Sequence, residues 1–155
     1  MSLPVMSEAQ DITLRAAVAA DFGFARGIHH AGMRWLGERL HGRWDDVVQD
    51  ERFKQKFVLG EVRIIVAGSD DAGYLQTAVE AGDVVIKELH IDEAFRNRGI
   101  GTKVLRMLLA EARRMAKPMT VTVVVFNPAL AFYQRAGFRI VSELDQRFRL
   151  RHDNQ

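Results

Sequence analysis

The chain has 155 residues, of which 48% are hydrophobic and 27% charged, a mixture typical of one soluble globular domain with a real core. The 22 Lys and Arg residues against 20 Asp and Glu leave a formal charge of +2, which gives no reason to expect a nucleic-acid partner. The absence of cysteine excludes disulfides, thiolate metal sites and a cysteine nucleophile, and it fits a reducing cytoplasmic setting.

The sequence suggests neither a membrane span nor a signal peptide. No apolar run approaches the roughly 18 residues that a membrane span needs. Residues 1–10 lack the basic end and the long apolar core of a signal peptide. We expect residues 1–155 to form a single domain, with a flexible N-terminus over residues 1–10.

The N-terminal part predicts one strand and two helices. Ile12–Arg15 alternates apolar and polar residues, as a half-buried strand does. Asp21 is a candidate N-cap for a helix that runs to about Gly37. Four glycines interrupt this segment, so the helix is expected to be broken or mobile. A second helix is expected over Trp44–Phe57.

Three strands with short polar turns follow, which predicts an antiparallel meander. The predicted strands are Val62–Gly68, Gly73–Ala78 and Val84–Ile91, with turns at Ser69–Ala72 and Glu80–Asp83.

The C-terminal part predicts two more helices and three strands. An amphipathic helix begins at Ile100 and ends before Pro118. Asn127 as N-cap and Pro128 at the first helical position predict the start of another helix. The remaining elements are a buried strand at Val121–Phe126, the second helix at Ala129–Ala136 with Gly137 as its cap, and terminal strands at Phe138–Val141 and Arg147–Leu150.

The segment Arg96–Thr102 joins a strand to a helix and predicts an anion-binding site. Gly99 and Gly101 carry no Cβ, so backbone N–H groups can approach an anion closely, and the helix start adds the positive end of its dipole. A Rossmann fingerprint would need Gly or Ala where Val104 stands, and no Walker loop occurs. A pyrophosphate fits such a site, although a glycine pair at this kind of turn also serves tight packing alone.

Two blocks of sequence resemble the GNAT family of acetyl-CoA-dependent N-acyltransferases. The first is Leu89-His-Ile followed by Arg96-Asn-Arg-Gly-Ile-Gly101, and the second is Asn127-Pro-Ala-Leu-Ala-Phe-Tyr133-Gln-Arg-Ala-Gly-Phe138. The resemblance extends in outline from Ile12 to Leu150. It implies an α/β fold with a mixed central sheet of about six to seven strands flanked by about four helices.

The resemblance also implies where acetyl-CoA binds. The backbone around Arg98–Thr102 would hold the pyrophosphate, while Leu89 and Ile91 would pair with the pantetheine arm. Asn127 would face that arm from the opposite strand, because in the family the two strands splay apart around the cofactor. The complete set of expected cofactor-binding residues is Leu89, His90, Ile91, Arg96, Asn97, Arg98, Gly99, Ile100, Gly101, Thr102, Asn127, Phe132 and Tyr133.

A thioester is already activated, so direct attack by a primary amine needs neither a metal nor an enzyme nucleophile. Tyr133 matches the family's usual proton donor to the leaving thiolate, and the N–H of Leu89 or His90 is a candidate oxyanion donor. Glu88 is a candidate general base; a water chain, or an ion pair of Glu88 with a cation, is the alternative. Tyr133 could also be an ordinary core aromatic.

The acceptor amine is the least determined part of the prediction. His29, His30, Trp35 and Trp44 lie in the region where the family builds its acceptor pocket, and one or two of them are expected to line it. Adjacent histidines on a helix point about 100° apart, which makes His29 and His30 poor joint metal ligands. A small-molecule amine is favoured over a peptide, and a homodimer through the terminal strands is compatible with the sequence. The alternatives are a protein lysine or N-terminal acetyltransferase, a non-catalytic acyl-CoA-binding or sensor module, and a generic nucleotide-binding domain.

Overall fold

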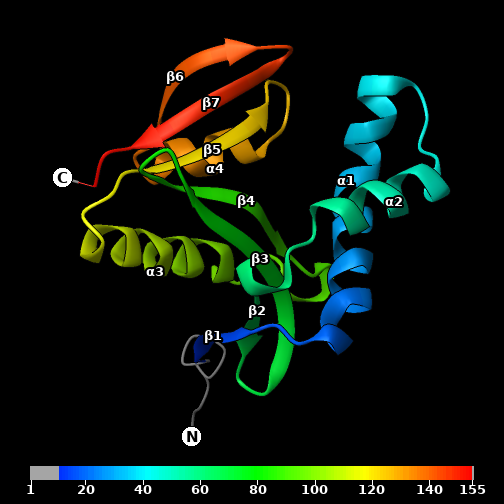
Figure 1. The fold of residues 1–155 in the computed structure, drawn as a ribbon, viewed down its shortest axis with the longest axis horizontal. Helices are drawn as coiled ribbons and strands as arrows, with labels where there is room; N and C mark the ends of the chain where they lie inside the picture. Colours follow the sequence, from blue (N-terminus) through cyan, green and yellow to red (C-terminus); the bar gives the residue numbers. More distant parts are fainter. Residues whose placement is uncertain (1–10, 155) are drawn as a thin grey trace, which may run out of the picture. The chain divides into compact units, whose positions relative to one another are not determined.

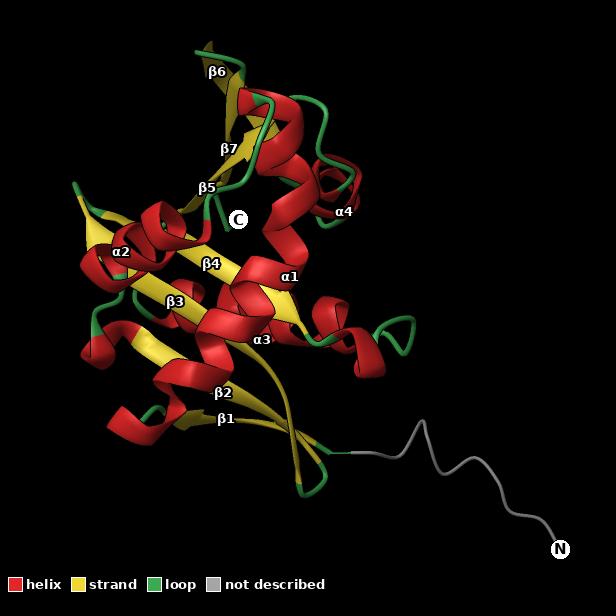
Figure 2. Cartoon of the chain, turned by 90° about the vertical axis from the view of Figure 1, so that its right-hand side faces the viewer, coloured by secondary structure: helices red, strands yellow, loops and turns green. Residues whose placement is uncertain are grey.

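The structure is a computed structural model that describes residues 11–154, so the expected flexible segment at residues 1–10 lies outside it. Its helices and strands are shown in Figures 1 and 2. The strands are β1 (Ile12–Ala16), β2 (Val62–Ala67), β3 (Asp70–Glu80), β4 (Asp83–Ile91), β5 (Met119–Val124), β6 (Arg139–Leu144) and β7 (Arg147–His152). The α-helices are α1 (Phe22–His41), α2 (Asp46–Lys56), α3 (Ile100–Arg114) and α4 (Ala129–Arg135).

The described chain divides into two compact units. One comprises residues 11–75 and 90–98, and the other comprises residues 76–89 and 99–154. Strands β3 and β4 run through both units, and the seven strands follow the order β1-β2-β3-β4-β5-β7-β6. The sheet is mixed, because β4 and β5 pair in parallel whereas β1–β2, β5–β7 and β6–β7 pair antiparallel. This confirms the predicted α/β class.

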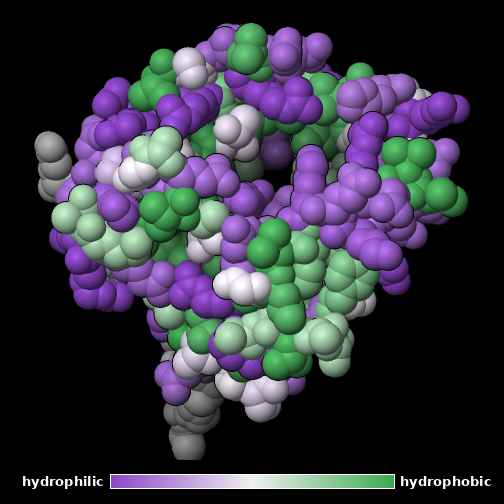
Figure 3. All heavy atoms as spheres, in the orientation of Figure 1, coloured by the Kyte–Doolittle hydropathy of each residue, from purple (hydrophilic) through white to green (hydrophobic). Residues whose placement is uncertain are grey.

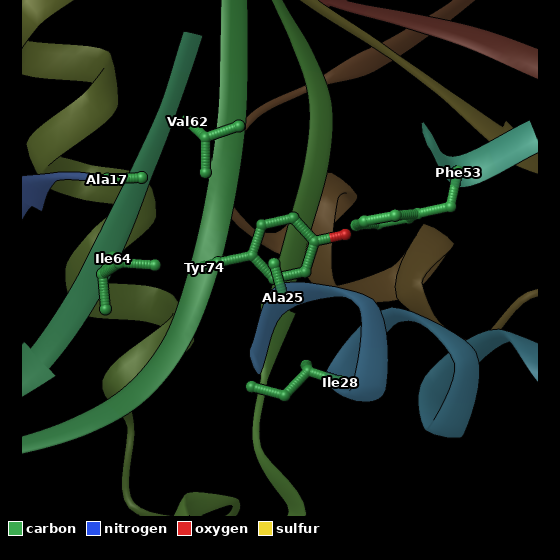
Figure 4. Packing of buried hydrophobic residues seen from close by; sticks show 7 residues of the cluster. All are labelled: Ala17, Ala25, Ile28, Phe53, Val62, Ile64 and Tyr74. Atoms are coloured by element: carbon green, nitrogen blue, oxygen red, sulfur yellow. The ribbon is translucent and has the colours of Figure 1, made fainter. Parts of the chain in front are cut away.

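The core of the first unit forms where α1 and α2 pack against β2 and β3. Ala25 and Ile28 of α1 and Phe53 of α2 contact residues of the two strands, including Tyr74. In Figure 4 the ring of Tyr74 points from its strand toward Phe53, with Ile28 below it on the helix. Ala25 and Tyr74 have no exposed surface, and Ile28 and Phe53 are also buried, so these residues mark the faces that α1, α2 and β3 turn toward the core.

Helix α1 is longer and more regular than its sequence predicts. It continues through Gly23, Gly27, Gly32 and Gly37 to His41, and it ends at Gly42 in a left-handed conformation with φ 81°. The helix thus runs past its predicted end near Gly37, and the expected break at its glycines was wrong, because tertiary packing of the buried face outweighs the weak helix propensity of glycine.

Helix α3, in the second unit, has the buried apolar face that the 3.6-residue period of its sequence predicts. Its buried residues are Ile100, Val104, Leu105, Leu108 and Ala112. Strand β5 is buried at Met119–Val121 and at Val123–Val124, with Thr122 exposed. Over the face of the molecule seen in Figure 3, hydrophilic residues predominate and apolar residues are scattered in small groups, as the composition predicts.

Candidate active site

The parallel ladder between β4 and β5 is short. It joins Val84, Val85 and Ile86 to Met119, Thr120 and Val121, and beyond Ile86 the described parts of both strands continue without ladder pairing to each other. Strand β5 meanwhile stays paired with β7 as far as Val124. Glu88 and Leu89 therefore lie on a stretch of β4 whose edge toward β5 is not used by the ladder, an arrangement that can take an extended ligand as an added strand.

Helix α3 begins with the geometry expected of an anion-binding helix start. Gly99 is its N-cap, with φ 77°, and the helical hydrogen bonds begin with the Lys103 N–H donating to the Gly99 carbonyl at 3.1 Å. The N–H groups of the residues between them, Ile100–Thr102, precede that ladder and point along the helix axis. The first turn contains no acidic residue. The dipole and the N–H groups together favour a phosphate here.

The basic residues before this helix start belong to the other unit and are held by their own segment. The Nε of Arg96 donates to the Ile91 carbonyl at 3.1 Å, and Arg98 donates to the Ala94 carbonyl at 3.3 Å. The Arg98 guanidinium also lies 5.2 Å from the centre of the Phe95 ring. Both arginines and Asn97, which has φ 64°, are exposed.

A cavity of about 420 Å³ lies between α3 and α4 in the second unit. Its lining residues are Thr102, Leu105, Arg106, Leu109, Phe132, Arg135 and Ala136. Two guanidinium groups and an aromatic ring suit a ligand that combines phosphate with a flat ring system. Thr102 and Phe132 were predicted, whereas Arg106 and Arg135 were not. Their helical spacing, four residues after Thr102 and three after Phe132, is the signal that could have found them.

Tyr133 is a buried phenol on α4. It is 6% exposed, and its ring meets Phe132 and Phe138 edge-on, with centroids 5.0 and 5.4 Å away. Burial raises the pKa of Tyr133 above its ordinary value, and the negative charge of Glu88 raises it further. The phenol carries its proton at neutral pH, as it already would at the ordinary tyrosine pKa of about 10, and a general acid must be protonated.

Asn127 starts α4 as the sequence predicts, with a shift of one position. Its side-chain oxygen accepts the N–H of Ala129 at 2.9 Å, while Pro128 rather than Asn127 occupies the N-cap position. Asn127 lies three residues after the end of β5 and is half-buried.

The end of β4 that belongs to the first unit is fixed by β3. A Cβ on Gly73 would overlap the carbonyl oxygen of His90, so only glycine permits this approach of the two backbones. Two residues after His90, the Asp92 N–H donates to the Ala72 carbonyl at 2.8 Å. Gly73 was not singled out from the sequence, although a lone glycine within a strand pattern is a known signal of such contacts.

Helix α1 and the segment that connects it to α2 bring together three of the four predicted acceptor-pocket residues. His29 and His30 are joined by a 3.0 Å contact between their Nδ1 atoms, and the Trp44 ring meets His30 edge-on at 5.1 Å. Asp50, which was not predicted, lies 2.8 Å from the Nε2 of His30. Trp35, also on α1, is 42% exposed.

The described part of the chain shows neither a metal-binding cluster nor a membrane-spanning helix. Within residues 11–154, no cluster of three or more metal-ligating side chains is placed to hold an ion. Within the same range, no helix combines the length and the apolar character that crossing a membrane requires.

Several solved structures with similar folds are acetyltransferases. The N-acetyltransferase PaiA from Thermoplasma acidophilum, solved with coenzyme A, shares 14% identity, with a TM-score of 0.75 over 92% of this chain and 98% of that one. An acetyltransferase from Thermus thermophilus shares 21% identity, with a TM-score of 0.71 over 91% and 96%. N-acetylglutamate synthase from Neisseria gonorrhoeae, solved with coenzyme A and N-acetyl-glutamate, shares 16%, with a TM-score of 0.63 over 92% of this chain but 35% of that one. The protein thus has the fold of these acetyltransferases.

The sequence makes the assignment more specific. A sequence model described as the acetyltransferase (GNAT) domain matches residues 54–140, more than half of the 155 residues. The chain therefore belongs to the GNAT acetyltransferase family. None of the curated proteins matches it significantly.

Proposed function

We propose that the protein is an N-acetyltransferase that transfers the acetyl group of acetyl-CoA to a primary amine by direct attack in a ternary complex. The observation that carries the proposal is Tyr133, a buried phenol that keeps its proton, in the same unit as Glu88 and the start of α3. The coenzyme A bound to PaiA and to N-acetylglutamate synthase supports the choice of cosubstrate.

The residues present suit acetyl-CoA. The N–H groups of Ile100–Thr102 at the start of α3 would hold the pyrophosphate, with Arg96 and Arg98 adding positive charge. The main chain of Leu89 and Ile91 would pair with the pantetheine arm along the part of β4 that its ladder with β5 leaves unused. Asn127 would meet the arm from the other strand. A ligand held this way presents its thioester near Leu89 and His90.

The reaction then needs two proton transfers and one oxyanion site. The neutral amine attacks the thioester carbonyl, and the N–H of Leu89 or His90 stabilises the oxyanion that forms. Collapse of the tetrahedral intermediate breaks the C–S bond, and Tyr133 gives its proton to the departing thiolate. The products are the amide and free coenzyme A, and Glu88 is the candidate that takes the proton of the amine.

We favour a small-molecule acceptor over a lysine side chain or a protein N-terminus. The acceptor would enter the region formed by α1, α2 and the segment between them, which carries His29, His30 and Trp44. A second copy of the chain is the protein partner to test, because an edge strand can pair with its equivalent in another copy. Strand β6 lies at the edge of the strand order and is exposed along its whole length, and its Leu144 has 74% of its surface exposed.

The test measures coenzyme A release with a panel of small amines and lysine peptides. Wild type is expected to turn over at least one amine, and Tyr133→Phe is expected to lower kcat by about 10²-fold or more while acetyl-CoA affinity persists. Gln134→Ala, an exposed neighbour on α4, is the control and should match wild type.

Two outcomes separate this function from its rivals. Tight acetyl-CoA binding without turnover of any amine or peptide would identify a non-catalytic binding or sensor module. Protection from thermal unfolding by ATP or NAD, with none from coenzyme A, would identify a generic nucleotide-binding domain.

A further inference from the structure

A continuous series of polar contacts and ring contacts crosses the first unit from α2 to β4. The Asp50 carboxylate lies 2.8 Å from the Nε2 of His30, and the Nδ1 of His30 lies 3.0 Å from the Nδ1 of His29. The His29 ring meets the His90 ring edge-on, with centroids 5.6 Å apart. The series thus links Asp50 to the strand residue that directly follows Leu89.

The contacts fix the tautomers of both neutral imidazoles. An ionised carboxylate only accepts hydrogen bonds, so the Nε2 of His30 must carry the hydrogen that it donates to Asp50. The Nδ1 of His30 then has the lone pair and accepts a hydrogen from the Nδ1 of His29. In neutral His29 the lone pair therefore lies on Nε2, which makes this atom the basic nitrogen of the pair.

Aromatic neighbours hold the series in place, and its two ends differ in their exposure to water. Phe53, buried in the core of Figure 4, packs against both rings, with centroids 5.1 Å from His29 and 5.9 Å from His30. Tyr74 stacks on His90 at 5.4 Å. The His30 side chain is only 18% exposed, whereas that of Asp50 is 48% exposed. The outer end of the series therefore meets solvent.

We propose that His29 is the general base for the acceptor amine, with His30 and Asp50 as positioning residues that hold its tautomer and share the proton it takes. This deepens the acetyltransferase proposed above and rests on it. The ammonium form of the acceptor gives one proton to the Nε2 of His29 and becomes the neutral amine that attacks the thioester. The imidazolium is stabilised through His30 by the Asp50 carboxylate, and the proton leaves to water. Glu88 is then not required as the base.

In the described contacts, few titratable groups lie against His29 and His30. Asp50 faces this pair from α2, His90 faces it from β4, and Tyr74 of β3 stacks on His90.

The variant that tests the proposal is His29→Asn. An asparagine amide reproduces the hydrogen that His29 donates from Nδ1, but it supplies no basic nitrogen in the place of Nε2. The assay compares an alkylamine that wild type accepts with its β-trifluorinated analogue, which is largely unprotonated at neutral pH. Asp50→Asn is the second variant, and His41→Asn, exposed at the end of the same helix, is the control.

The expected result is a selective loss. With the alkylamine, kcat of His29→Asn should fall by about 10²-fold, and with the fluorinated amine by less than about threefold, because no proton then needs to be removed. Asp50→Asn should show the same selectivity with a smaller loss, acetyl-CoA affinity should stay that of wild type, and the His41 control should be unaffected.

Two results would overturn the inference. An equal loss with both amines would make His29 a packing or positioning residue, and full activity of His29→Asn with the alkylamine would exclude it as the base. Failure of wild type to release coenzyme A with any amine is a separate outcome, because it would overturn the acetyltransferase function and the relay together. If His29→Asn does not fold, the selectivity of Asp50→Asn decides in its place.

Discussion

Tyr133 and Glu88 are electrostatically coupled within one compact unit. Burial is the main cause that raises the pKa of the Tyr133 phenol, and the negative charge of Glu88 adds to it. The negative charge of Glu88 repels the negative charge of a Tyr133 phenolate, so the phenol loses its proton less readily. The charge of the residue that the sequence offered as the base thus affects the protonation of the residue that it offered as the acid.

Replacing Glu88 by Gln should lower the pKa of Tyr133 toward its ordinary value, because the repulsion of the phenolate is removed while burial stays. The chain has two tyrosines, so the measurement uses Tyr74→Phe as background and follows phenolate absorbance during an alkaline titration. Glu143→Gln, exposed on β6, is the control. An unchanged titration of Tyr133 in the Glu88 variant would contradict the coupling.

Gly73→Ala should destabilise the protein by about 1–3 kcal/mol, because the new methyl group overlaps the His90 carbonyl and must displace backbone. Since His90 belongs to the proposed oxyanion site, kcat should fall as well. Gly60→Ala, where the added Cβ meets nothing within 4 Å, is the matched control. Urea unfolding and coenzyme A release measure the two effects, and equal behaviour of the two variants would refute the close approach.

Gly99→Ala tests the helix start as an anion site. Gly99 and Gly82 have positive φ angles of 77° and 86°, and an added Cβ has open space at both, so each substitution should cost about 1–2 kcal/mol of stability. Only Gly99 caps α3, so Gly99→Ala alone should weaken coenzyme A binding, by about tenfold. Calorimetric titration compares the two variants. Equal affinities would place the pyrophosphate elsewhere.

Asp21 should contribute to the acid stability of the first unit. Its carboxylate accepts two hydrogen bonds from Arg15, at 2.9 and 3.0 Å, and one from the Val18 N–H at 2.8 Å. The Arg15 hydrogen bonds, more than the one from Val18, hold the pKa of Asp21 below its ordinary value, although burial opposes them. A lowered folded-state pKa contributes stability that is complete above the unfolded-state pKa and is lost as the pH falls through the folded-state value.

Asp21→Asn should therefore cost about 1–3 kcal/mol at neutral pH, and the difference from wild type should shrink below about pH 4. Urea unfolding across this range measures it, with Asp70→Asn, exposed on β3, as control. A difference that stays constant as the pH falls would show that the charge of Asp21 is not the cause.

Gly27→Ala should stabilise α1 by about 0.4–1 kcal/mol, because the position is helical and an added Cβ meets nothing within 4 Å. At Gly37 of the same helix, the Cβ would lie 2.9 Å from the Trp44 ring, so Gly37→Ala should give no such gain. Thermal unfolding compares the two. A gain at Gly37 equal to that at Gly27 would contradict the packing of Trp44.

Most helices and strands could be predicted from the sequence, and the errors in their predicted bounds have physical causes. Pro118 and the apolar run located β5, but the strand begins at Met119 rather than Val121, because pairing with β4 and β7 extends it. The expected turn at Ser69–Ala72 was wrong except at Ser69. Gly68 has φ 65° and allows a tighter turn, so β3 already begins at Asp70. Hydrogen bonds to neighbouring strands set such ends, and they depend on residues far away in the sequence.

The sequence by itself determined the family, the start of α3 and the choice of Tyr133 as the candidate proton donor, because helix caps, glycine turns and the two sequence blocks are local patterns. Only the tertiary structure decided the burial of the Tyr133 phenol, the early end of the β4–β5 ladder, and the need for glycine at Gly73. It also brought Asp50 to the histidine pair from a different helix. These features depend on contacts between segments far apart in the chain, which no local pattern records.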